Sequence, residues 1–279
     1  GSKWDIYYFS GIPMSDYCYP VIASDNNDYV YIFYENHTSG SCFEFLKRDP
    51  SNGNWYINSI PSWTWWSKVR NISVWIKGSA IWLTYEYIFT SSDYDINWTL
   101  GTSSGWRKGA LAYSYCMEKH PSITVSDSYA VIAYQVYDGN EWNITVKHSN
   151  GVYGYNFTYS THTGSSYSQS GYNETNPSLY ASGNTVWIAW DKEFSATDHD
   201  IRYTKSTDGG ASFEDFQYFS SSSDDERYPS IACVDGNPNH LIIVYVNSTA
   251  NNFLAAESTD GGTNWEIMKV SDTPVYYIA

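Results

Sequence analysis

The sequence predicts an all-β protein, and three observations lead to that prediction. The 279 residues include 28 Tyr, 13 Trp and 11 Phe, an aromatic fraction of 19%, and aromatic residues favour strands over helices. Apolar and polar residues alternate with a period of two in several short segments, which is the periodicity of a half-buried strand. One short phrase recurs along the chain, and such internal repetition is typical of modular β-architectures.

The repeated phrase is Pro-x-Ile/Leu. It stands at Pro20–Ile22, Pro121–Ile123, Pro177–Leu179 and Pro229–Ile231, and looser versions begin at Asn71 (NISVWI) and Thr273 (TPVYYIA). An alternating segment follows each of the first five copies (YVYIFY, AIWLTY, AVIAY, TVWIAW and LIIVY), and a third strand of the type DINW, NITV or DIRY comes after it. Repetition of a four-strand unit at this spacing predicts a β-propeller of four-stranded antiparallel blades.

Five units are complete, and the two chain ends supply the parts of a sixth. We expect TPVYYIA to pair with residues 4 to 18, so that N- and C-terminal strands close a six-bladed propeller in one domain, 1–279. The sixth blade is short by about one strand, so either it is abbreviated or the chain is a fragment of a longer protein, and self-association through it stays open. A two-sheet sandwich is the alternative fold.

Two turns carry the most specific motif of the chain. Both fit SxDxGxxW/F, with Ser206, Asp208, Gly210 and Phe213 in one and Ser258, Asp260, Gly262 and Trp265 in the other; degenerate copies lie at Arg48–Trp55 and Leu100–Trp106. Glycine permits a tight turn, Ser and Asp side chains bind turn amides, and the aromatic residue packs beneath. We therefore predict that these residues are structural and not catalytic.

These turns, with the phrases NPSLYASGNTVWIAWDKEF and HDIRYTKSTDGGASF, resemble the Asp-box (BNR) repeat propellers typified by sialidases. The resemblance covers nearly the whole chain and implies the fold, whereas the family includes sialidases, other glycosidases, receptor ectodomains and noncatalytic modules. A sialidase would need three clustered arginines, a Tyr–Glu nucleophile pair and an Asp acid/base. The phrase Phe9–Pro13 lacks the family's first arginine, and the chain holds only Arg48, Arg70, Arg107, Arg202 and Arg227. We expect Arg48, Arg107 and Arg202 at the end away from the active-site mouth, so the arginine triad is incomplete.

The repeat also predicts where a site would form, because loops that enter first strands and leave second strands should gather on one face. We call the charged residues of these loops the rim residues: Asp16, Glu35, Arg70, Glu86, Glu118, Glu174, Asp191, Glu226 and Arg227. Lys119, His120, Gln135 and Asp272 accompany them. They predict an acidic pocket for a sugar or a cation. The alternative is that charged residues merely end strands at a hydrated edge.

The catalytic candidates within this set are Glu226, Arg227, Glu86, Asp191 and Arg70. Trp63, Trp65 and Trp66 in SWTWWS offer a sugar-stacking platform, or else Trp63 and Trp65 form the buried face of an outer strand.

Composition excludes several classes of protein. The formal net charge is −15 and the 15 basic residues are scattered, so we expect no nucleic-acid partner. No apolar run reaches the 18 residues of a membrane span, so we expect no direct membrane insertion. Neither paired cysteines nor an HxxxH helix suggests a metal site, and we expect no cofactor. Because 30 acidic residues lose much of their charge near pH 4, we expect tolerance to acid.

Seven Asn-x-Ser/Thr sequons point to an extracellular or cell-surface glycoprotein. They are Asn36, Asn71, Asn97, Asn143, Asn156, Asn173 and Asn247. Low charge and Tyr-rich strands suggest a microbial, archaeal, surface protein. Cys18, Cys42, Cys116 and Cys233 allow three disulfide pairings or buried thiols.

The expected function is a noncatalytic extracellular propeller that binds glycan or protein, or a structural subunit of a surface layer or appendage. Two alternatives stay open: a sialidase-like glycoside hydrolase that uses rim carboxylates, and the ectodomain of a longer receptor-type protein.

Overall fold

The computed structural model describes residues 17–36, 43–60, 69–162, 171–219 and 222–270. Strands make up most of this part of the chain, and its helix is confined to a single 3-10 turn at Val234–Gly236. The predicted all-β class is therefore confirmed.

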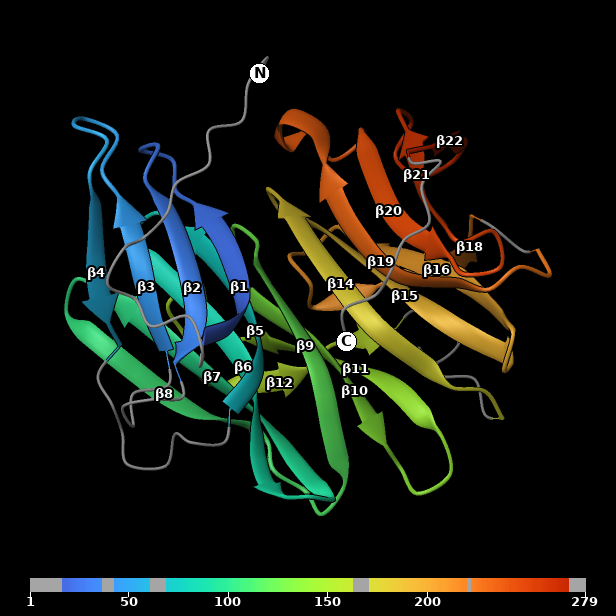
Figure 1. Ribbon diagram of the computed structural model, residues 1–279, viewed down its shortest axis with the longest axis horizontal. Helices are drawn as coiled ribbons and strands as arrows, with labels where there is room; N and C mark the ends of the chain where they lie inside the picture. Colours follow the sequence, from blue (N-terminus) through green and yellow to red (C-terminus); the bar gives the residue numbers. More distant parts are fainter. Residues whose placement is uncertain (1–16, 37–42, 61–68, 163–170, 220–221, 271–279) are drawn as a thin grey trace.

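The strands form five consecutive units of four, which we call blades 1 to 5 (Figure 1). Blade 1 contains β1 (Tyr17–Ser24), β2 (Val30–Asn36), β3 (Phe43–Arg48) and β4 (Trp55–Ser59); blade 2 contains β5 (Val69–Lys77), β6 (Ala80–Thr90), β7 (Asp93–Thr102) and β8 (Gly105–Ala112); blade 3 contains β9 (Met117–Val125), β10 (Ala130–Tyr137), β11 (Trp142–Ser149) and β12 (Phe157–Tyr159); blade 4 contains β14 (Glu174–Ser182), β15 (Thr185–Ser195), β16 (Asp198–Ser206) and β18 (Gln217–Tyr218); blade 5 contains β19 (Glu226–Cys233), β20 (Leu241–Asn247), β21 (Asn252–Ser258) and β22 (Glu266–Lys269).

Within each blade the strands lie side by side in the order of the sequence, and each pairs antiparallel with the next. Two further connections link neighbouring blades. A single parallel bridge from Tyr94 to Met117 joins blades 2 and 3 into one eight-stranded sheet, and the short strand β13 (Thr161–His162) runs parallel to β17 (Ser212–Phe213) between blades 3 and 4.

The first strand of each blade lies innermost, and β1, β5, β9, β14 and β19 contact one another in that order around a common centre (Figure 1). The pairing among the described strands does not close into a ring. The residues expected to form the closing blade, 4 to 18 and 273 to 279, lie largely outside the described part of the chain.

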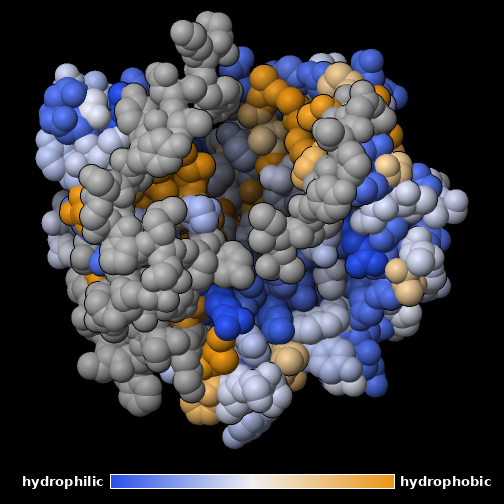
Figure 2. Space-filling model, viewed as in Figure 1, coloured by the Kyte–Doolittle hydropathy of each residue, from blue (hydrophilic) through white to orange (hydrophobic). Residues whose placement is uncertain are grey.

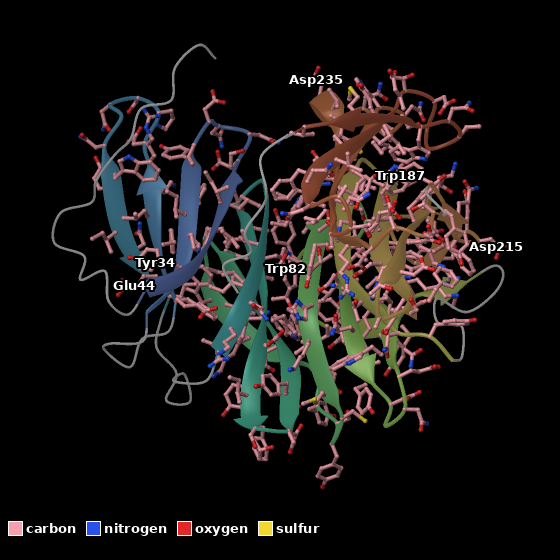
Figure 3. The ribbon with its side chains drawn as sticks, turned by 45° about the vertical axis from the view of Figure 1, so that its right-hand side comes forward. Tyr34, Glu44, Trp82, Trp187, Asp215 and Asp235 are labelled. Atoms are coloured by element: carbon pink, nitrogen blue, oxygen red, sulfur yellow. The ribbon has the colours of Figure 1, made fainter. Side chains whose placement is uncertain are left out.

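Hydrophobic clusters between successive blades form the core. The second strands of blades 2, 3 and 4 each contribute to two clusters, one from each face, because they are covered on both sides, whereas those of blades 1 and 5 contribute to one. Trp82 and Trp187 occupy the same position in the second strands of blades 2 and 4, and each connects its blade to the next one (Figure 3). The Trp82 indole donates a hydrogen bond to the Val152 carbonyl at 2.9 Å, and the Trp187 indole donates one to the Pro238 carbonyl at 3.2 Å.

The turn at Ser206–Phe213 is held by its own side chains. The Ser206 hydroxyl donates to Asp208 Oδ1 at 2.7 Å and accepts the Gly210 N–H at 2.8 Å, while Asp208 Oδ1 also accepts the Ser212 N–H at 2.9 Å. The Phe213 side chain is buried beneath the turn. The turn is thus a self-bonded unit anchored by an aromatic residue.

The turn at Ser258–Trp265 repeats this arrangement. Ser258 donates to Asp260 Oδ1 at 2.9 Å and accepts the Gly262 N–H at 2.9 Å, and Asp260 accepts the Asn264 N–H at 2.9 Å. These hydrogen bonds lower the pKa of Asp260 to about 2. The carboxylates are therefore committed to the turns.

Glycine is required where the first turn packs against blade 3. Gly210 has a φ of +100°, and a Cβ atom there would overlap the side chain of Val131. Gly139 has nearly the same φ, +102°, but nothing lies within 4 Å of the position of its Cβ atom. Replacing Gly139 with alanine therefore measures the free-energy cost of the backbone conformation alone, whereas replacing Gly210 adds the cost of overlap with Val131.

We expect Gly210→Ala to lower the free energy of unfolding by about 2–4 kcal/mol, because overpacking adds to the left-handed backbone penalty. Gly139→Ala, the matched control, should lose only about 1 kcal/mol. Urea unfolding of both variants measures the difference. Equal losses would show that the turn does not pack tightly on blade 3.

Candidate functional site

A bulge interrupts the innermost strand of blades 2, 3, 4 and 5 at the same repeat position. One residue of each bulge has a left-handed backbone: Asn71 (φ 52°), His120 (49°), Asn176 (54°) and Tyr228 (57°). We call these four residues the axial ring. In the described chain only seven non-glycine residues have positive φ, so more than half of them share one position. Clusters of such strained residues are typical of functional sites.

Hydrogen bonds from the preceding blade hold two residues of the axial ring in this conformation. The His120 N–H donates to Glu86 Oε1 at 2.7 Å, and the Asn176 N–H donates to Gln135 Oε1 at 3.0 Å. Glu86 and Gln135 lie in the second strands of blades 2 and 3, paired with Arg70 and Lys119 of the innermost strands. A rim side chain of one blade thus satisfies the bulge amide of the next.

The serine of the repeated phrase makes a second connection of the same kind. Ser73, Ser122 and Ser178 each accept the backbone N–H of the Ile or Leu in the next copy: Ile123 N to Ser73 Oγ at 3.1 Å, Leu179 N to Ser122 Oγ at 3.0 Å, and Ile231 N to Ser178 Oγ at 3.1 Å. The repeated phrase is therefore explained by contacts between blades at the centre of the molecule.

The axial ring surrounds a central pocket with a volume of about 440 Å³. Its walls combine the ring residues with the prolines and apolar residues that follow them. The lining residues are Pro20, Val21, Asn71, Ile72, His120, Pro121, Ser122, Asn176, Pro177, Ser178, Tyr228 and Pro229. Amide, imidazole and phenol groups beside flat apolar surfaces are suited to binding a polar ring such as a sugar.

The carboxylates behind the axial ring are already hydrogen-bonded. Glu86 Oε1 accepts both the Asn71 side-chain amide at 2.7 Å and the His120 N–H. Asp191 accepts the Asn176 side-chain amide at 3.1 Å and the Thr175 hydroxyl at 3.3 Å. Burial raises the pKa of Asp191 to about 7, although these hydrogen bonds lower it.

The described rim residues with carboxylate side chains are buried. They therefore do not lie at a hydrated edge, which was the alternative interpretation. Glu35, Glu86, Glu118, Glu174, Asp191 and Glu226 are at most 3% exposed. Ser114 donates to Glu118 at 2.5 Å and Ser222 donates to Glu226 at 3.1 Å, two equivalent contacts in blades 3 and 5. Asp16 and Asp272 lie outside the described residues.

The arginines do not gather at the pocket. Arg70 is exposed beside the axial ring, and Arg227 Nε lies 2.7 Å from Asp225 Oδ1. Arg202, expected away from the rim, instead extends toward it: its Nη1 lies 2.5 Å from Glu174 Oε1, and both side chains are fully buried. The reason is that β16 is buried along its length, so a cation at its centre needs a buried partner.

Arg202 belongs to a cluster of cations and aromatic rings in blade 4. Its guanidinium carbon lies 4.0 Å from the ring centroid of Phe216, and Lys192 Nζ lies 4.3 Å from that of Tyr172. Desolvation raises the pKa of Glu174 to about 7 and lowers that of Lys192 to about 8. The cluster therefore holds groups that titrate near neutrality.

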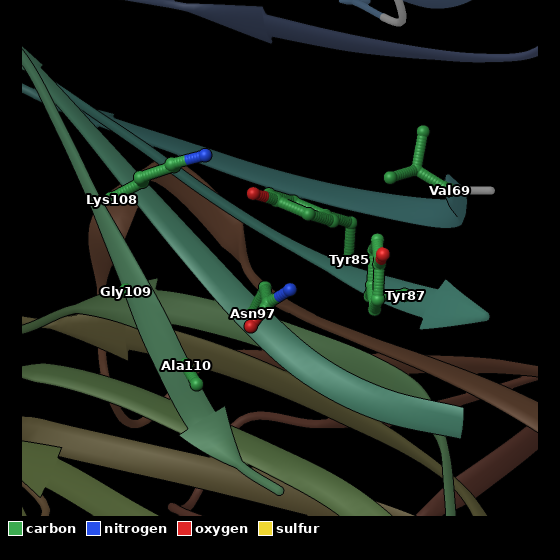
Figure 4. A pocket seen from close by; sticks show the side chains of 7 residues that line it. All are labelled: Val69, Tyr85, Tyr87, Asn97, Lys108, Gly109 and Ala110. Carbon is green, nitrogen blue, oxygen red and sulfur yellow. The ribbon is translucent and has the colours of Figure 1, made fainter. Parts of the chain in front are cut away.

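A second cavity, of about 320 Å³, lies off the axis in blade 2 (Figure 4). All four strands of the blade line it, through Val69, Tyr85, Tyr87, Asn97, Lys108, Gly109 and Ala110. None of the predicted rim residues lines it. Asn97, one of the sequon asparagines, faces this cavity (Figure 4).

The sequons differ in accessibility. Asn156 is exposed, whereas Asn71, Asn143, Asn173 and Asn247 each donate a side-chain hydrogen bond, respectively to Glu86, Asp138, Glu193 and Asp224. The side chain of Asn36 lies outside the described residues, as do Trp63, Trp65 and Trp66.

Two of the cysteines are described with their side chains. Cys116 and Cys233 are free thiols, and burial raises the pKa of Cys233 to about 11. Cys42 and the side chain of Cys18 lie outside the described part. Among the described residues no group of three or more His, Cys, Asp and Glu side chains is arranged to hold a metal ion. No helix in that part is long and apolar enough to cross a membrane.

None of the carboxylates that sequence reasoning named lines the central pocket, and of the residues that do line it, sequence reasoning named His120 but missed Asn71, Asn176 and Tyr228. The signal was present, because these residues stand directly before the Pro or Ile of the repeated phrase. The bulge that turns this position toward the axis could not be predicted from the sequence.

Comparison with known proteins gives similarity in structure but not in sequence. No protein-family model matches the chain, and no curated protein matches it in sequence. A protein of unknown function from Dyadobacter fermentans matches with a TM-score of 0.65 at 11% identity, over 92% of this chain and 83% of that one. The sialidase of Trypanosoma rangeli matches with a TM-score of 0.57 at 11% identity, over 91% of this chain but 48% of the sialidase. The α-L-arabinanase of Cellvibrio cellulosa matches with a TM-score of 0.51 at 12% identity, over 89% of this chain and 94% of that one. The chain thus has a sialidase-like β-propeller fold, which it shares with propeller glycoside hydrolases.

Proposed function

We propose that this chain is a noncatalytic glycan-binding propeller, and that the central pocket is its binding site. The observation that carries the proposal is that the polar groups lining the pocket and the carboxylates are different residues in different places. The axial ring lines the pocket with groups that can hydrogen-bond a sugar, while the carboxylates Glu86 and Asp191 are buried and hydrogen-bonded behind it. A glycosidase needs carboxyl groups that reach the scissile bond.

The arginines support the same proposal. A carboxylate clamp of the sialidase type needs three converging guanidinium groups, whereas Arg202 is committed to Glu174 and Arg227 to Asp225. We therefore assign the chain to the Asp-box propellers without the arginine triad, with the turns at Ser206–Phe213 and Ser258–Trp265 as its Asp-boxes.

We further propose that a sixth blade completes the propeller from the two chain ends. Ser230 occupies the position of Ser73, Ser122 and Ser178 but is exposed, so it offers an acceptor to a following inner strand. Figure 2 shows hydrophobic side chains over blade 1 and over blade 5, the two blades between which the proposed sixth blade would lie. A monomer in solution fits closure within one chain, and a dimer would mean that a second copy supplies the strand.

An extracellular, cell-surface location is the setting we propose, as a binding or structural module of a microbial, archaeal, surface glycoprotein. Asn156 is the described sequon best placed to carry a glycan, since it is exposed and its neighbour Thr158 is exposed too. Mass measurement after expression through a secretory pathway, with Asn156→Gln as the comparison, tests this assignment.

Binding to the central pocket is tested with a printed array of neutral and acidic oligosaccharides. Tyr228→Asn removes the phenol ring while keeping a residue that tolerates the left-handed backbone. We expect it to weaken binding at least about tenfold, the loss of one good aromatic contact. Tyr56→Asn is the control, because Tyr56 is 48% exposed, close to the 46% of Tyr228, but lies on the outermost strand of blade 1.

The same preparations are assayed with p-nitrophenyl glycosides. We expect no turnover by the unaltered chain. Hydrolysis that disappears in Glu86→Gln or Asp191→Asn would instead support the glycoside hydrolase alternative and overturn the noncatalytic proposal.

A further inference from the structure

A third cavity, of about 380 Å³, lies beside the hairpin between β15 and β16 of blade 4. It is lined by Phe194, Asp198, Asp200, Tyr218 and Ser222. It shares no lining residue with the central pocket or with the cavity of blade 2. It is therefore a separate site, which we call the blade-4 pocket.

Two aromatic rings form walls of the blade-4 pocket. Phe194 and Tyr218 are each more than one-third exposed, and their ring centroids lie 6.4 Å apart. Both rings already contact cations of the protein, with Lys192 Nζ 4.8 Å from the Phe194 centroid and the Arg202 guanidinium carbon 4.6 Å from the Tyr218 centroid. The pocket thus contains aromatic groups in the geometry that favours positive charge.

Two carboxylates form the polar part of the pocket. Asp198 and Asp200 stand two residues apart on β16, so they lie on the same face of the strand. Asp200 is 4% exposed, and its Oδ1 accepts one hydrogen bond, from the Ser222 N–H at 3.2 Å. Asp198 Oδ1 is buried and has no hydrogen-bond partner among the described residues. A buried carboxylate oxygen of this kind is costly unless a donor or cation reaches it.

The charges around the pocket leave it acidic. Arg202 is paired with Glu174 at 2.5 Å, and Arg227 with Asp225 at 2.7 Å. The pairing leaves Lys192 beside two carboxylates, and both burial and the neighbouring Asp198 raise the pKa of Asp200. A further positive charge would offset this excess of negative charge.

We propose that the blade-4 pocket binds a primary ammonium group carried on a small ligand, with Asp198 and Asp200 accepting its hydrogen bonds and Phe194 and Tyr218 packing against its carbon skeleton. An amino sugar and a lysine side chain both present this group. The ammonium of either has three donors and a compact charge, which match two adjacent carboxylates.

Blade 2 provides a natural comparison. Its hairpin between β6 and β7 has the same pattern, with Phe89, Asp93 and Asp95 in the places of Phe194, Asp198 and Asp200. The two blades differ in the residue of the fourth strand. Ala110 pairs with Asn97 in blade 2, whereas Tyr218 pairs with Arg202 at the equivalent position in blade 4. Lys119 Nζ also lies 4.3 Å from the ring centroid of Tyr94 at this hairpin. Blade 2 therefore has the acids but not the two aromatic walls.

The experiment is a calorimetric titration at pH 7 with glucosamine, N-acetylglucosamine and Nα-acetyl-lysine amide. We expect saturable binding of at least one of the two ammonium compounds and none of N-acetylglucosamine, whose nitrogen is uncharged. Tighter binding of glucosamine identifies an amino sugar as the ligand, and tighter binding of the lysine derivative identifies a lysine side chain.

Asp198→Asn and Phe194→Leu should each weaken ammonium binding about tenfold or more, the effect of losing a charge-assisted hydrogen bond or an aromatic packing contact. Asp93→Asn, the matched control in blade 2, and Tyr228→Asn at the axis should leave it unchanged. Thermal unfolding of each variant confirms that it is folded. Equal binding by Asp198→Asn, equal binding of N-acetylglucosamine, or no heat from either ammonium compound would overturn the proposal, whatever the central pocket binds.

Discussion

Replacing Arg202 with methionine is expected to lower the free energy of unfolding by about 3–5 kcal/mol. Arg202 and Glu174 are both fully buried, with Nη1 and Oε1 2.5 Å apart. Removing one partner of a buried ion pair leaves the other charge without compensation in a medium of low polarity, and losses of this size are typical. Urea unfolding at pH 8 measures the effect, because Glu174 is ionised there in the unaltered chain, so the variant must either keep an uncompensated carboxylate or take up a proton.

Three comparisons make this result specific. Lys205→Met breaks an exposed pair, with Lys205 Nζ 3.8 Å from Glu214 Oε2, and should cost no more than about 1 kcal/mol. Adding Glu174→Gln to the Arg202→Met variant should recover part of the loss, because no buried charge remains. The loss should also be smaller at pH 5, where the isolated carboxyl is protonated. A loss of less than about 1 kcal/mol at pH 8 would mean that the pair does not stabilise blade 4.

Lowering the pH from 8 to 6 is expected to stabilise the fold. Burial raises the pKa of Glu118 to about 7, that of Asp191 to about 7 and that of Asp95 to about 6. In an unfolded chain these groups titrate near pH 4. Between about pH 7 and pH 4 the native state therefore binds more protons than the unfolded state, so stability rises as the pH falls. Between pH 8 and pH 6 each group with a pKa of about 7 contributes about 1.4 kcal/mol, and Asp95 contributes less.

The histidines set the lower limit of this gain. Burial lowers the pKa values of His148 and His199 below the usual 6.5, so their protonation at lower pH favours the unfolded state and costs stability. We therefore expect a maximum near pH 6, about 3 kcal/mol above the stability at pH 8. The acid tolerance expected from the excess of carboxylates has the same direction, but its physical source is burial of particular groups.

Urea unfolding at half-unit steps of pH, in the unaltered chain and in Glu118→Gln and Asp191→Asn, measures this profile. Each variant should flatten the rise, since it removes one titrating group. Asp49→Asn is the control, because Asp49 is only partly buried and hydrogen bonds from Ser51 lower its pKa. A steady fall in stability from pH 8 to pH 5 would contradict the assignment.

Strands were the most predictable part of the fold. The alternating segments ending at Tyr34, Tyr85, Tyr134, Trp190 and Tyr245 all lie in the second strands of their blades, because period-two alternation is a local property of the chain. The four-strand repeat could also be anticipated, since the same order of segments recurs along the chain. Both inferences required only the order of residues.

The chemistry of the site was harder to predict. That Glu86 and Asp191 are buried depends on hydrogen bonds from Asn71 and Asn176 across a bulge, and bulges have no clear sequence signature. That Arg202 reaches Glu174 depends on how deeply β16 is covered by its neighbours. These are properties of three-dimensional packing, to which the order of residues along one strand is insensitive.

The axial ring has a consequence for how this protein can be redesigned. At His120 and Asn176 the backbone is held from behind by Glu86 and Gln135, which accept hydrogen bonds from the main-chain amides. Asn, His and Tyr already occupy the same position in different blades. Selectivity can therefore be altered first at His120, which is held through its main-chain amide, whereas the side chains of Asn71 and Asn176 also bond Glu86 and Asp191.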